Sequence, residues 1–311
     1  MTLTVAICTR DRCSLLDKTL ARMTEALPLT GFDWEVLVVD NGSSDSTQEV
    51  ARRYQGQIPL RVVTEHRPGL SNARNCAVAS AAGQYIVWTD DDVLVGDRWL
   101  AEYAAATKRF PDAAFFGGPI FPWFEGTAPK WITESWSVIH SAFAARDLGE
   151  ECFQIDQTRL PFGANYVVRT DWQRQFLYNN ALGRTPGQKW IGGEEIDVLQ
   201  RIIDAGGVGW WIPTATVKHW IPRDRQTYRY VRRYFSGQGR LRNLEESAQG
   251  RFTVLGVPTW LIRSWLLAEM RLIVSRALHP PETWSRAMVA AAVLAGELSA
   301  VREARRTANQ L

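Results

Sequence analysis

The sequence predicts an α/β fold, with a doubly wound, mostly parallel sheet followed by a helical C-terminal extension. Between Leu3 and Trp88, short runs rich in Val and Ile alternate with segments of helical periodicity. Such alternation is typical of βαβ units, whose parallel strands are buried on both faces. After residue 222 the chain continues with an arginine-rich stretch and two stretches rich in Ala and Leu. Because 311 residues suit one large domain with an appendage, we expect a body over residues 1–222 and a helical extension over residues 223–311.

The expected elements follow one another in a regular order. The first four strands are predicted at residues 3–8, 34–39, 60–64 and 85–88. Residues 43–46 supply caps for the helix after the second strand, and Ser71 supplies one for the helix after the third. The Pro-, Gly- and Trp-rich stretch from 117 to about 151 predicts a long surface excursion or lid. Regular structure is expected again at residues 160–168, 194–205, 215–219 and 228–244.

Composition excludes several classes of protein. A formal net charge of +3 and 46% apolar residues argue against intrinsic disorder and against bulk nucleic-acid binding. The four cysteines form no C-x-x-C pair, and the chain opens on an apolar strand instead of a signal peptide, so we expect a reducing, cytoplasmic compartment. Charged residues interrupt the most apolar stretch, 257–278, so no membrane-spanning helix is expected. The 14 tryptophans suit either core packing or platforms for sugar rings.

Polar residues follow several of the predicted strands. They are residues 9–12 after the first strand, 40–43 after the second and 90–92 after the fourth. Ligands of open α/β sheets bind outside the carboxyl ends of the strands, so these residues are expected to meet in one polar crevice. The run after the first strand contains no glycine, which argues against the phosphate loops of dinucleotide-binding proteins, P-loop proteins and nucleotidyltransferases.

Three consecutive aspartates, Asp90, Asp91 and Asp92, point to a cation site. Like charges repel at this spacing, and such a cluster usually persists because a hard cation neutralises it. Alternation along an extended backbone places Asp90 and Asp92 on one side and Asp91 on the other. Taken alone, the cluster also suits a solvated acidic turn that caps the following helix.

Four motifs in order carry a family resemblance. They are VVDNGSSDST at 38–47, PGLSNARN at 68–75, DDD at 90–92 and GGEEID at 192–197. Together they resemble the family 2 inverting glycosyltransferases with the GT-A fold, over roughly residues 3–222. The later runs HWIPRDR at 219–225 and YVRRYFSGQG at 230–239 are similar to a bacterial subgroup associated with extracellular polysaccharide synthesis. The resemblance implies transfer of a sugar from a nucleotide-diphosphate sugar to a glycan or lipid-linked acceptor, with Mn²⁺ or Mg²⁺ as cofactor.

The resemblance assigns several residues to the nucleotide sugar. Thr9 and Arg10 would lie beside the nucleotide, and Asp40 would accept hydrogen bonds from the base. Arg74 would contact the diphosphate side of the crevice or brace the acidic cluster, since a guanidinium suits phosphate and carboxylate alike. From the residues alone, Thr9 and Arg10 also suit a simple strand-end turn, and Arg74 a structural ion pair.

The resemblance also implies a metal site. Asp92 would bind the metal directly, Asp90 would reach the ribose or a metal-bound water, and Asp91 is grouped with them at the nucleotide sugar. His219 matches a distal histidine that completes the metal site in many relatives, although a lone histidine is often structural. The metal would bridge the donor diphosphate and neutralise charge on the leaving group.

An acidic pair ahead of a helix is the expected catalytic element. In the family its second member removes a proton from the acceptor hydroxyl. Here that member is Glu195 where the family more often has Asp, so Glu194 stays an alternative base. Trp190 beside them would form a wall against which the acceptor sugar stacks. Alone, the two glutamates also suit the first turn of a helix, where acidic residues complement the helix dipole.

The extension and the enzymatic role each leave alternatives. Arginines and aromatic residues over 228–244 predict either a surface for lipid headgroups or a helix packed on the body. Residues 260–274 are apolar nearly all round, so this helix needs further cover from a partner helix, a second subunit in a homodimer, or the inner face of the cell membrane. The rival to an enzyme is a catalytically inactive, transferase-like scaffold of a membrane-associated polysaccharide assembly.

Overall fold

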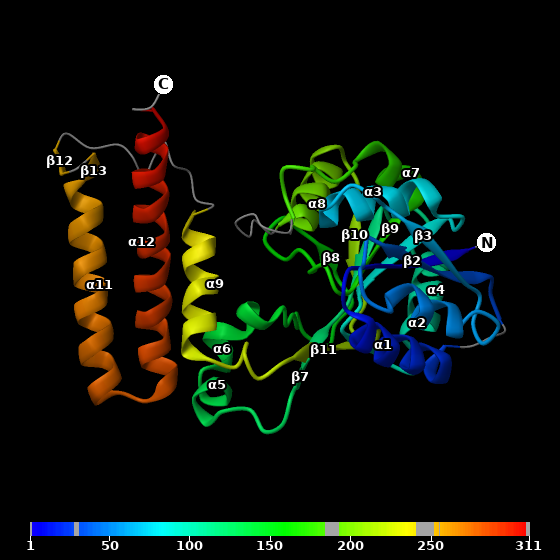
Figure 1. The fold of residues 1–311 in the computed structure, drawn as a ribbon, viewed down its shortest axis with the longest axis horizontal. Helices are drawn as coiled ribbons and strands as arrows, with labels where there is room; N and C mark the ends of the chain where they lie inside the picture. The colour runs from blue at the N-terminus through cyan, green and yellow to red at the C-terminus, as the bar shows by residue number, and fades with distance from the viewer. Residues whose placement is uncertain (1, 28–30, 184–192, 241–251, 255, 309–311) are drawn as a thin grey trace. The chain divides into compact units, whose positions relative to one another are not determined.

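The computed structural model describes residues 2–27, 31–183, 193–240, 252–254 and 256–308 (Figure 1). The chain folds into two compact units. The sheet unit comprises Met1–Trp123 and Ala144–Trp220, and the helical unit comprises Phe124–Phe143 and Ile221–Leu311. The division after Trp220 lies beside the boundary expected near residue 222, but an internal segment of the sheet half of the sequence folds with the C-terminal helices.

The sheet unit is built on a mixed sheet whose described strands have the order β3-β2-β1-β4-β9-β6-β10-β8. Their bounds are β1 Leu3–Thr9, β2 Trp34–Asp40, β3 Leu60–Thr64, β4 Tyr85–Asp90, β6 Phe115–Gly117, β8 Gln154–Ile155, β9 Tyr166–Arg169 and β10 Gly209–Trp211. β1 pairs in parallel with β2 and β4, and β2 pairs in parallel with β3. The predicted parallel part of the sheet is therefore confirmed. β9 runs antiparallel to both of its neighbours, β4 and β6, which makes the whole sheet mixed.

Helices cover both faces of this sheet, so the doubly wound arrangement is also confirmed (Figure 1). They are α1 Cys13–Ala26, α2 Thr47–Arg53, α3 Leu70–Ser80, α4 Trp99–Arg109, α7 Thr170–Gln175 and α8 Glu194–Asp204. Successive strand residues point to opposite faces. Val36 and Val38 accordingly lie in one core with side chains of α1 and α4, whereas Leu37 and Val39 lie in another with side chains of α3 and α8.

A second, smaller sheet joins segments that are far apart in the sequence. Its order is β5-β11-β7, with β5 Val93–Val95, β11 Val217–Ile221 and β7 Ile120–Phe124. β11 runs antiparallel to β5 and places His219 opposite Val93. This register brings His219 next to Asp92, the residue that directly precedes β5.

The helical unit is built around α12 Pro281–Ala308, which packs against α9 Tyr228–Arg240 and α11 Thr259–Leu278 (Figure 1). Its other elements are α5 Lys130–Glu134, α6 Trp136–Ile139, the 3₁₀ helix η1 His140–Phe143, and the strands β12 Thr253–Val254 and β13 Val257–Pro258. One core joins Ile139 and Phe143 to Phe235 and Met288. By length and composition the window Pro281–Arg305 of α12 could cross a membrane, but 56% of it is buried, as in a core helix of a soluble protein.

Two local expectations are wrong, and one of the two alternatives for α9 is not supported. Ser71 does not cap α3, because α3 begins at Leu70 and the Ser71 hydroxyl, inside the helix, donates to the Leu182 carbonyl at 2.7 Å. The stretch after Gly117 is no surface excursion, since Ile132 and Ile139 in it are completely buried. Nor does α9 present its aromatic side to the outside, because its tyrosines pack against the core of the helical unit. In the last two cases the covering residues come from distant parts of the chain, which local patterns do not reveal.

The contact between α9 and α12 depends on two glycines. A β-carbon at Gly239 would lie 2.0 Å from the Val293 carbonyl oxygen, and one at Gly296 would lie 2.0 Å from the Ser236 carbonyl oxygen. Both obstacles are helix backbone atoms, which move only if a whole helix shifts. The two helices therefore approach closely because neither glycine carries a side chain.

Gly296→Ala should lower the free energy of unfolding by about 1–3 kcal/mol, the usual effect of overpacking, although alanine is the better helix former. Denaturant unfolding followed by circular dichroism measures the change. The control is Ala290→Leu at an exposed position of the same helix, which should alter stability by no more than about 0.5 kcal/mol. Equal stability of the two variants would contradict the close contact.

Candidate active site

Parallel pairing brings the polar strand ends together at one edge of the main sheet. Thr9 at the end of β1 lies opposite Asp40 at the end of β2, and Cys8 lies opposite Asp90 at the end of β4. Asp40 is buried, and its carboxylate accepts the Ser43 amide at 2.9 Å and the Gln48 side-chain amide at 2.6 Å. The expected polar crevice thus has a physical basis in strand register.

Asp91 faces inward from this edge. Its carboxylate accepts the Thr9 hydroxyl at 2.7 Å and pairs with an Arg12 nitrogen at 2.6 Å. Burial raises the pKa of Asp91 to about 7, and the positive charge of Arg12 opposes that rise. Asp91 therefore anchors the loop after β1 to the end of β4.

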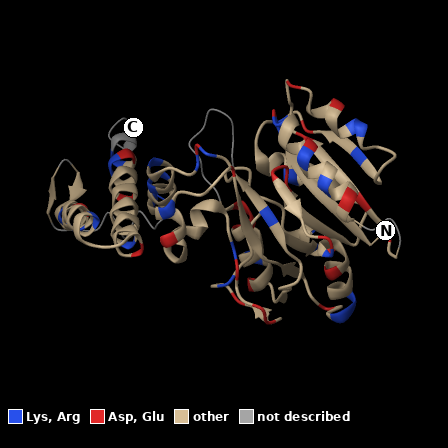
Figure 2. Cartoon of the chain, turned by 90° about the horizontal axis from the view of Figure 1, so that it is seen from below, with Lys and Arg blue, Asp and Glu red and all other residues tan. Residues whose placement is uncertain are grey.

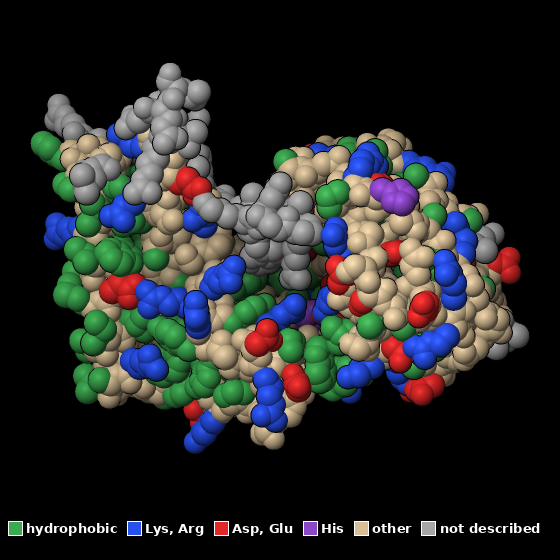
Figure 3. Space-filling model, viewed as in Figure 1, with side chains coloured by type: hydrophobic (Ala, Val, Ile, Leu, Met, Phe, Trp, Pro, Cys, Tyr) green, Lys and Arg blue, Asp and Glu red, His purple; other side chains and the backbone are tan. Residues whose placement is uncertain are grey.

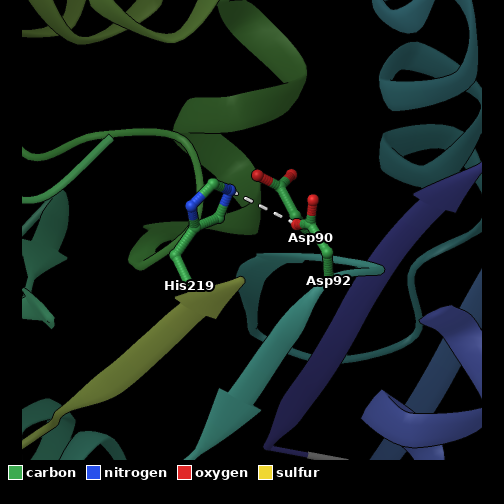
Figure 4. A group of neighbouring side chains, drawn as sticks. All are labelled: Asp90, Asp92 and His219. Atoms are coloured by element: carbon green, nitrogen blue, oxygen red, sulfur yellow. Dashed lines mark ion pairs between the residues drawn. The ribbon is translucent and has the colours of Figure 1, made fainter. Parts of the chain in front are cut away.

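Asp90 and Asp92 converge with His219, as Figure 4 shows. One ligand atom from each of the three lies within 4.8 Å of the others, and His219 Nε2 is 3.4 Å from Asp92 Oδ1. Asp90 and Asp92 thus lie together on the side of His219, but residues 91 and 92 form a turn instead of an extended strand, and Arg12 pairs with both Asp91 and Asp92. His219 is buried, and its Nδ1 has no hydrogen-bond partner among the described residues. Two carboxylates and an imidazole form a donor set that fits Mn²⁺ or Mg²⁺.

Arg74 connects the aspartates to the acidic pair at the start of α8. Its Nη1 lies 3.1 Å from Glu194 and 4.0 Å from Glu195, and its Nη2 lies 4.0 Å from Asp90. The guanidinium is buried beside the faces of Trp88 and Tyr178, at 5.8 and 5.3 Å from the ring centroids. Arg74 thus braces carboxylates on both sides of the site, one of the two roles considered for it.

The two glutamates differ in their surroundings. The Glu194 side chain is 6% exposed and is the nearer partner of Arg74, whereas the Glu195 side chain is 15% exposed and accepts the Gly163 amide at 3.2 Å. Burial, followed by the charge of Glu194, raises the pKa of Glu195 to about 7, and Arg74 opposes the rise. A carboxylate of that pKa exchanges protons readily near neutral pH.

Two other predicted residues, Arg10 and Trp190, are not among the contacts described above. The side chain of Arg10 is 36% exposed and lies 3.5 Å from the carboxylate of Asp11. Trp190, expected as a wall for the acceptor sugar, lies outside the described residues.

Arg12 is a site residue that the sequence did not single out. It precedes α1 as its N-cap residue, and its two terminal nitrogens lie 2.6 Å from Asp91 and 2.6 Å from Asp92. The signal available was electrostatic: three adjacent aspartates need positive charge nearby, and the run after the first strand holds two arginines. Which of the two faces the aspartates depends on the turn between β1 and α1, which sequence alone does not specify.

The family of the chain follows from comparison with known proteins. The model of glycosyl transferase family 2 matches residues 4–164, more than half of the chain. The chain belongs to glycosyl transferase family 2. The resemblance drawn from the four motifs is thereby confirmed.

The curated relatives of this family 2 glycosyltransferase include enzymes of bacterial glycan and glycoside synthesis. It is 28% identical over 221 residues to the succinoglycan biosynthesis protein ExoM of Rhizobium meliloti, an alignment covering 69% of this chain and 66% of that protein. It is 36% identical over 109 residues to a validoxylamine A glucosyltransferase of Streptomyces hygroscopicus, covering 33% and 25% respectively. The alignments thus span about two thirds of the first relative and a quarter of the second.

Solved structures share the fold of this glycosyltransferase. TarS of S. aureus, residues 1–349, has a TM-score of 0.54 at 14% identity, with 99% of this chain and 92% of that one covered. The mannosyltransferase PcManGT from Pyrobaculum calidifontis, solved with GDP-Man and Mn²⁺, has a TM-score of 0.53 at 16% identity, with 99% and 75% covered. These likenesses confirm the GT-A α/β fold with C-terminal helices.

Arg12→Met should destabilise the sheet unit in a pH-dependent manner. The folded pKa of Asp91 lies above its ordinary value of 3.8, so the stability tied to its protonation is complete below about pH 4 and is lost as the pH rises through about 7. Removing Arg12 raises that pKa further. We expect a loss of roughly 3 kcal/mol at pH 8 and a smaller loss at pH 5. The loss is at the low end for a broken buried ion pair because solvent reaches Arg12, whose side chain is 30% exposed.

Denaturant unfolding of the full chain at both pH values measures this effect. Arg10→Met is the control, because it removes an arginine of the same loop whose pairing with Asp11 is exposed. Equal destabilisation at the two pH values would contradict the role assigned to Arg12.

Proposed function

We propose that this chain transfers a sugar from a nucleotide-diphosphate sugar to a hydroxyl of a glycan or lipid-linked glycan, with inversion, in polysaccharide or glycoconjugate biosynthesis. Family membership and the relatives' names support this donor and this pathway class. The observation that carries the proposal is the position of Glu195, a carboxylate whose pKa is raised to about 7 and which is joined through Arg74 to Asp90.

The donor side of the site would hold the cofactor and the nucleotide. Asp92, Asp90 and His219 would hold Mn²⁺ or Mg²⁺, which when bound acts as a Lewis acid toward the diphosphate. PcManGT, a structure of the same fold, was solved with GDP-Man and Mn²⁺.

The chain's own side chains would orient the nucleotide. Asp40 would accept a hydrogen bond from the base, since a carboxylate has more acceptor sites than its bonds to the Ser43 amide and the Gln48 side chain use. Thr9 and Arg10 would lie beside the nucleotide, with the half-exposed Arg10 able to reach it. Asp91 would support these groups through Thr9 and Arg12.

Glu195 would act as the general base. Its ionised carboxylate takes the proton of the acceptor hydroxyl while the hydroxyl oxygen forms a bond to the anomeric carbon. The bond from that carbon to the diphosphate oxygen breaks, and the electron pair leaves with the nucleoside diphosphate. A single displacement from the opposite side inverts the anomeric configuration.

Glu194 would position the base instead of replacing it. It is the more buried of the pair and lies closer to Arg74, so it fixes the guanidinium that also faces Glu195 and Asp90. The described residues retain both the acidic pair and the proposed metal ligands, so they offer no support for an inactive scaffold.

Asp92→Ala should abolish metal-dependent binding of the donor, because it removes the carboxylate closest to His219. Calorimetric titration of the full chain with nucleotide sugars and Mn²⁺ tests this, and donor hydrolysis without acceptor identifies the sugar to use. Asp97→Ala is the control, since that side chain is 81% exposed and binds Arg22 at the surface. Unchanged affinity and metal dependence in Asp92→Ala would refute the metal assignment.

Glu195→Gln should keep donor affinity but slow sugar transfer by roughly 10²–10⁴-fold, the usual contribution of a general base. Wild-type transfer should decline as the pH falls below about 7, because protonation removes the base, and the variant should lose this dependence. Glu194→Gln is the matched comparison and should cost less. The roles are exchanged if Glu194→Gln is inactive with donor binding intact while Glu195→Gln transfers at the wild-type rate.

A further inference from the structure

Helix α11 carries an apolar face that the described part of the helical unit leaves uncovered. Only Leu261, Ala268 and Leu272 of this helix are buried, and they pack inside the unit. Its exposed large apolar side chains are Trp260, Leu266, Leu267, Met270, Ile273, Val274 and Leu278, with exposed fractions from 43% to 73%. Soluble proteins rarely expose so many large apolar residues together.

These side chains form one continuous face. Trp260, Leu267 and Val274 are seven residues apart. Met270 lies three positions after Leu267 and four before Val274, and Ile273 lies three positions after Met270, spacings that align on one side of a helix. The face runs the length of the 20-residue helix, or roughly 30 Å. In the hairpin before the helix, Phe252 and Val254 are exposed as well. Figure 3 shows hydrophobic side chains gathered over α11, with basic side chains among them.

The charges on α11 are predominantly positive (Figure 2). Arg263, Arg271 and Arg276 are exposed. The one acidic residue of the helix, Glu269, is engaged by Arg232 and by the Trp265 indole. The exposed face therefore combines apolar side chains with cations, and the one carboxylate of the helix, Glu269, is half-buried and paired.

The combination of apolar and basic side chains distinguishes between two partners that could cover this face, a second copy of the chain and a lipid bilayer. A two-fold partner copy would bring the same face against itself, so Arg263 and Arg271 would meet like charges and be buried without carboxylates. At a bilayer surface, the aliphatic stems of arginine lie along the acyl chains while the guanidinium reaches lipid phosphate. Anionic lipids add attraction of about 1 kcal/mol per arginine near the surface.

We propose that α11 lies flat in the interface of an anionic lipid bilayer and holds the enzyme at the membrane surface. The apolar residues enter the acyl boundary, and the arginines contact the headgroup phosphates. The buried α12 stays within the helical unit. This assignment does not depend on the proposed transfer reaction, because it rests on residues of α11 alone.

Flotation of the full-length chain with vesicles tests the proposal. The wild-type chain should float with vesicles of phosphatidylcholine mixed with phosphatidylglycerol, and less with phosphatidylcholine alone or in high salt. Met270→Ser with Val274→Ser should weaken binding at least tenfold, since each side chain gains of order 1 kcal/mol or more on burial. Phe121→Ser with Leu177→Ser, exposed apolar positions of the sheet unit, is the matched control and should bind like wild type.

A second pair of substitutions tests the charge. Arg263→Gln with Arg271→Gln should reduce binding to anionic vesicles by about 25-fold, roughly fivefold for each arginine, and leave binding to neutral vesicles unchanged. Circular dichroism and donor hydrolysis in solution should match wild type in every variant, which separates lost binding from misfolding.

Two outcomes would overturn the proposal. In the first, the wild-type chain does not float and light scattering shows a dimer that Met270→Ser with Val274→Ser dissociates, so the face belongs to a second copy. In the second, the wild-type chain neither floats nor self-associates.

Discussion

The site depends on how two arginines hold a concentration of negative charge. Five carboxylates lie near one edge of the main sheet, from Asp90, Asp91, Asp92, Glu194 and Glu195. Their mutual repulsion in a partly buried setting would oppose folding without nearby cations. Arg12 comes from the start of α1 and Arg74 from α3, so the positions of both helices on the sheet are tied to this charge balance.

The two arginines lie at different distances from the five carboxylates, and this difference separates the roles of otherwise similar residues. Arg12 engages Asp91 and Asp92, whose side chains are both 3% exposed, and Arg74 is closest to Glu194. The carboxylates held more loosely are Asp90 and Glu195, each 4.0 Å from Arg74 and each more exposed. Asp90 can meet a cation together with the Oδ1 atom of Asp92, which faces His219, and Glu195 can meet an acceptor. A catalytic division of labour can therefore follow from where the counter-charges lie.

Sequence patterns captured the parts of the fold that local rules specify. Apolar runs with helical segments between them gave β1 to β4 and their parallel pairing, and strand-end polarity gave the crevice. Local rules did not predict the short strands β8 and β10 or the antiparallel direction of β9. Strands of two to four residues take their pairing register from neighbouring strands. Arg12 and the packing of Ile132 in the helical unit likewise depend on tertiary contacts.

The apolar residues of α11 fall into a buried set and an exposed set. Because the two sets lie on different sides of the helix, the spacing of its apolar residues shows no single stripe. Gly239 and Gly296 let α9 and α12 approach closely, so α12 fills the centre of the helical unit. With that centre filled, α11 needs only one narrow side, around Leu261, Ala268 and Leu272, to join the core. Ile262 and Trp265 pack partly against the core as well, but the other large apolar residues of the helix are exposed. Although α11 is apolar nearly all round, it is therefore only partly buried. One side packs in the core of the helical unit, and the other faces the surroundings of the protein.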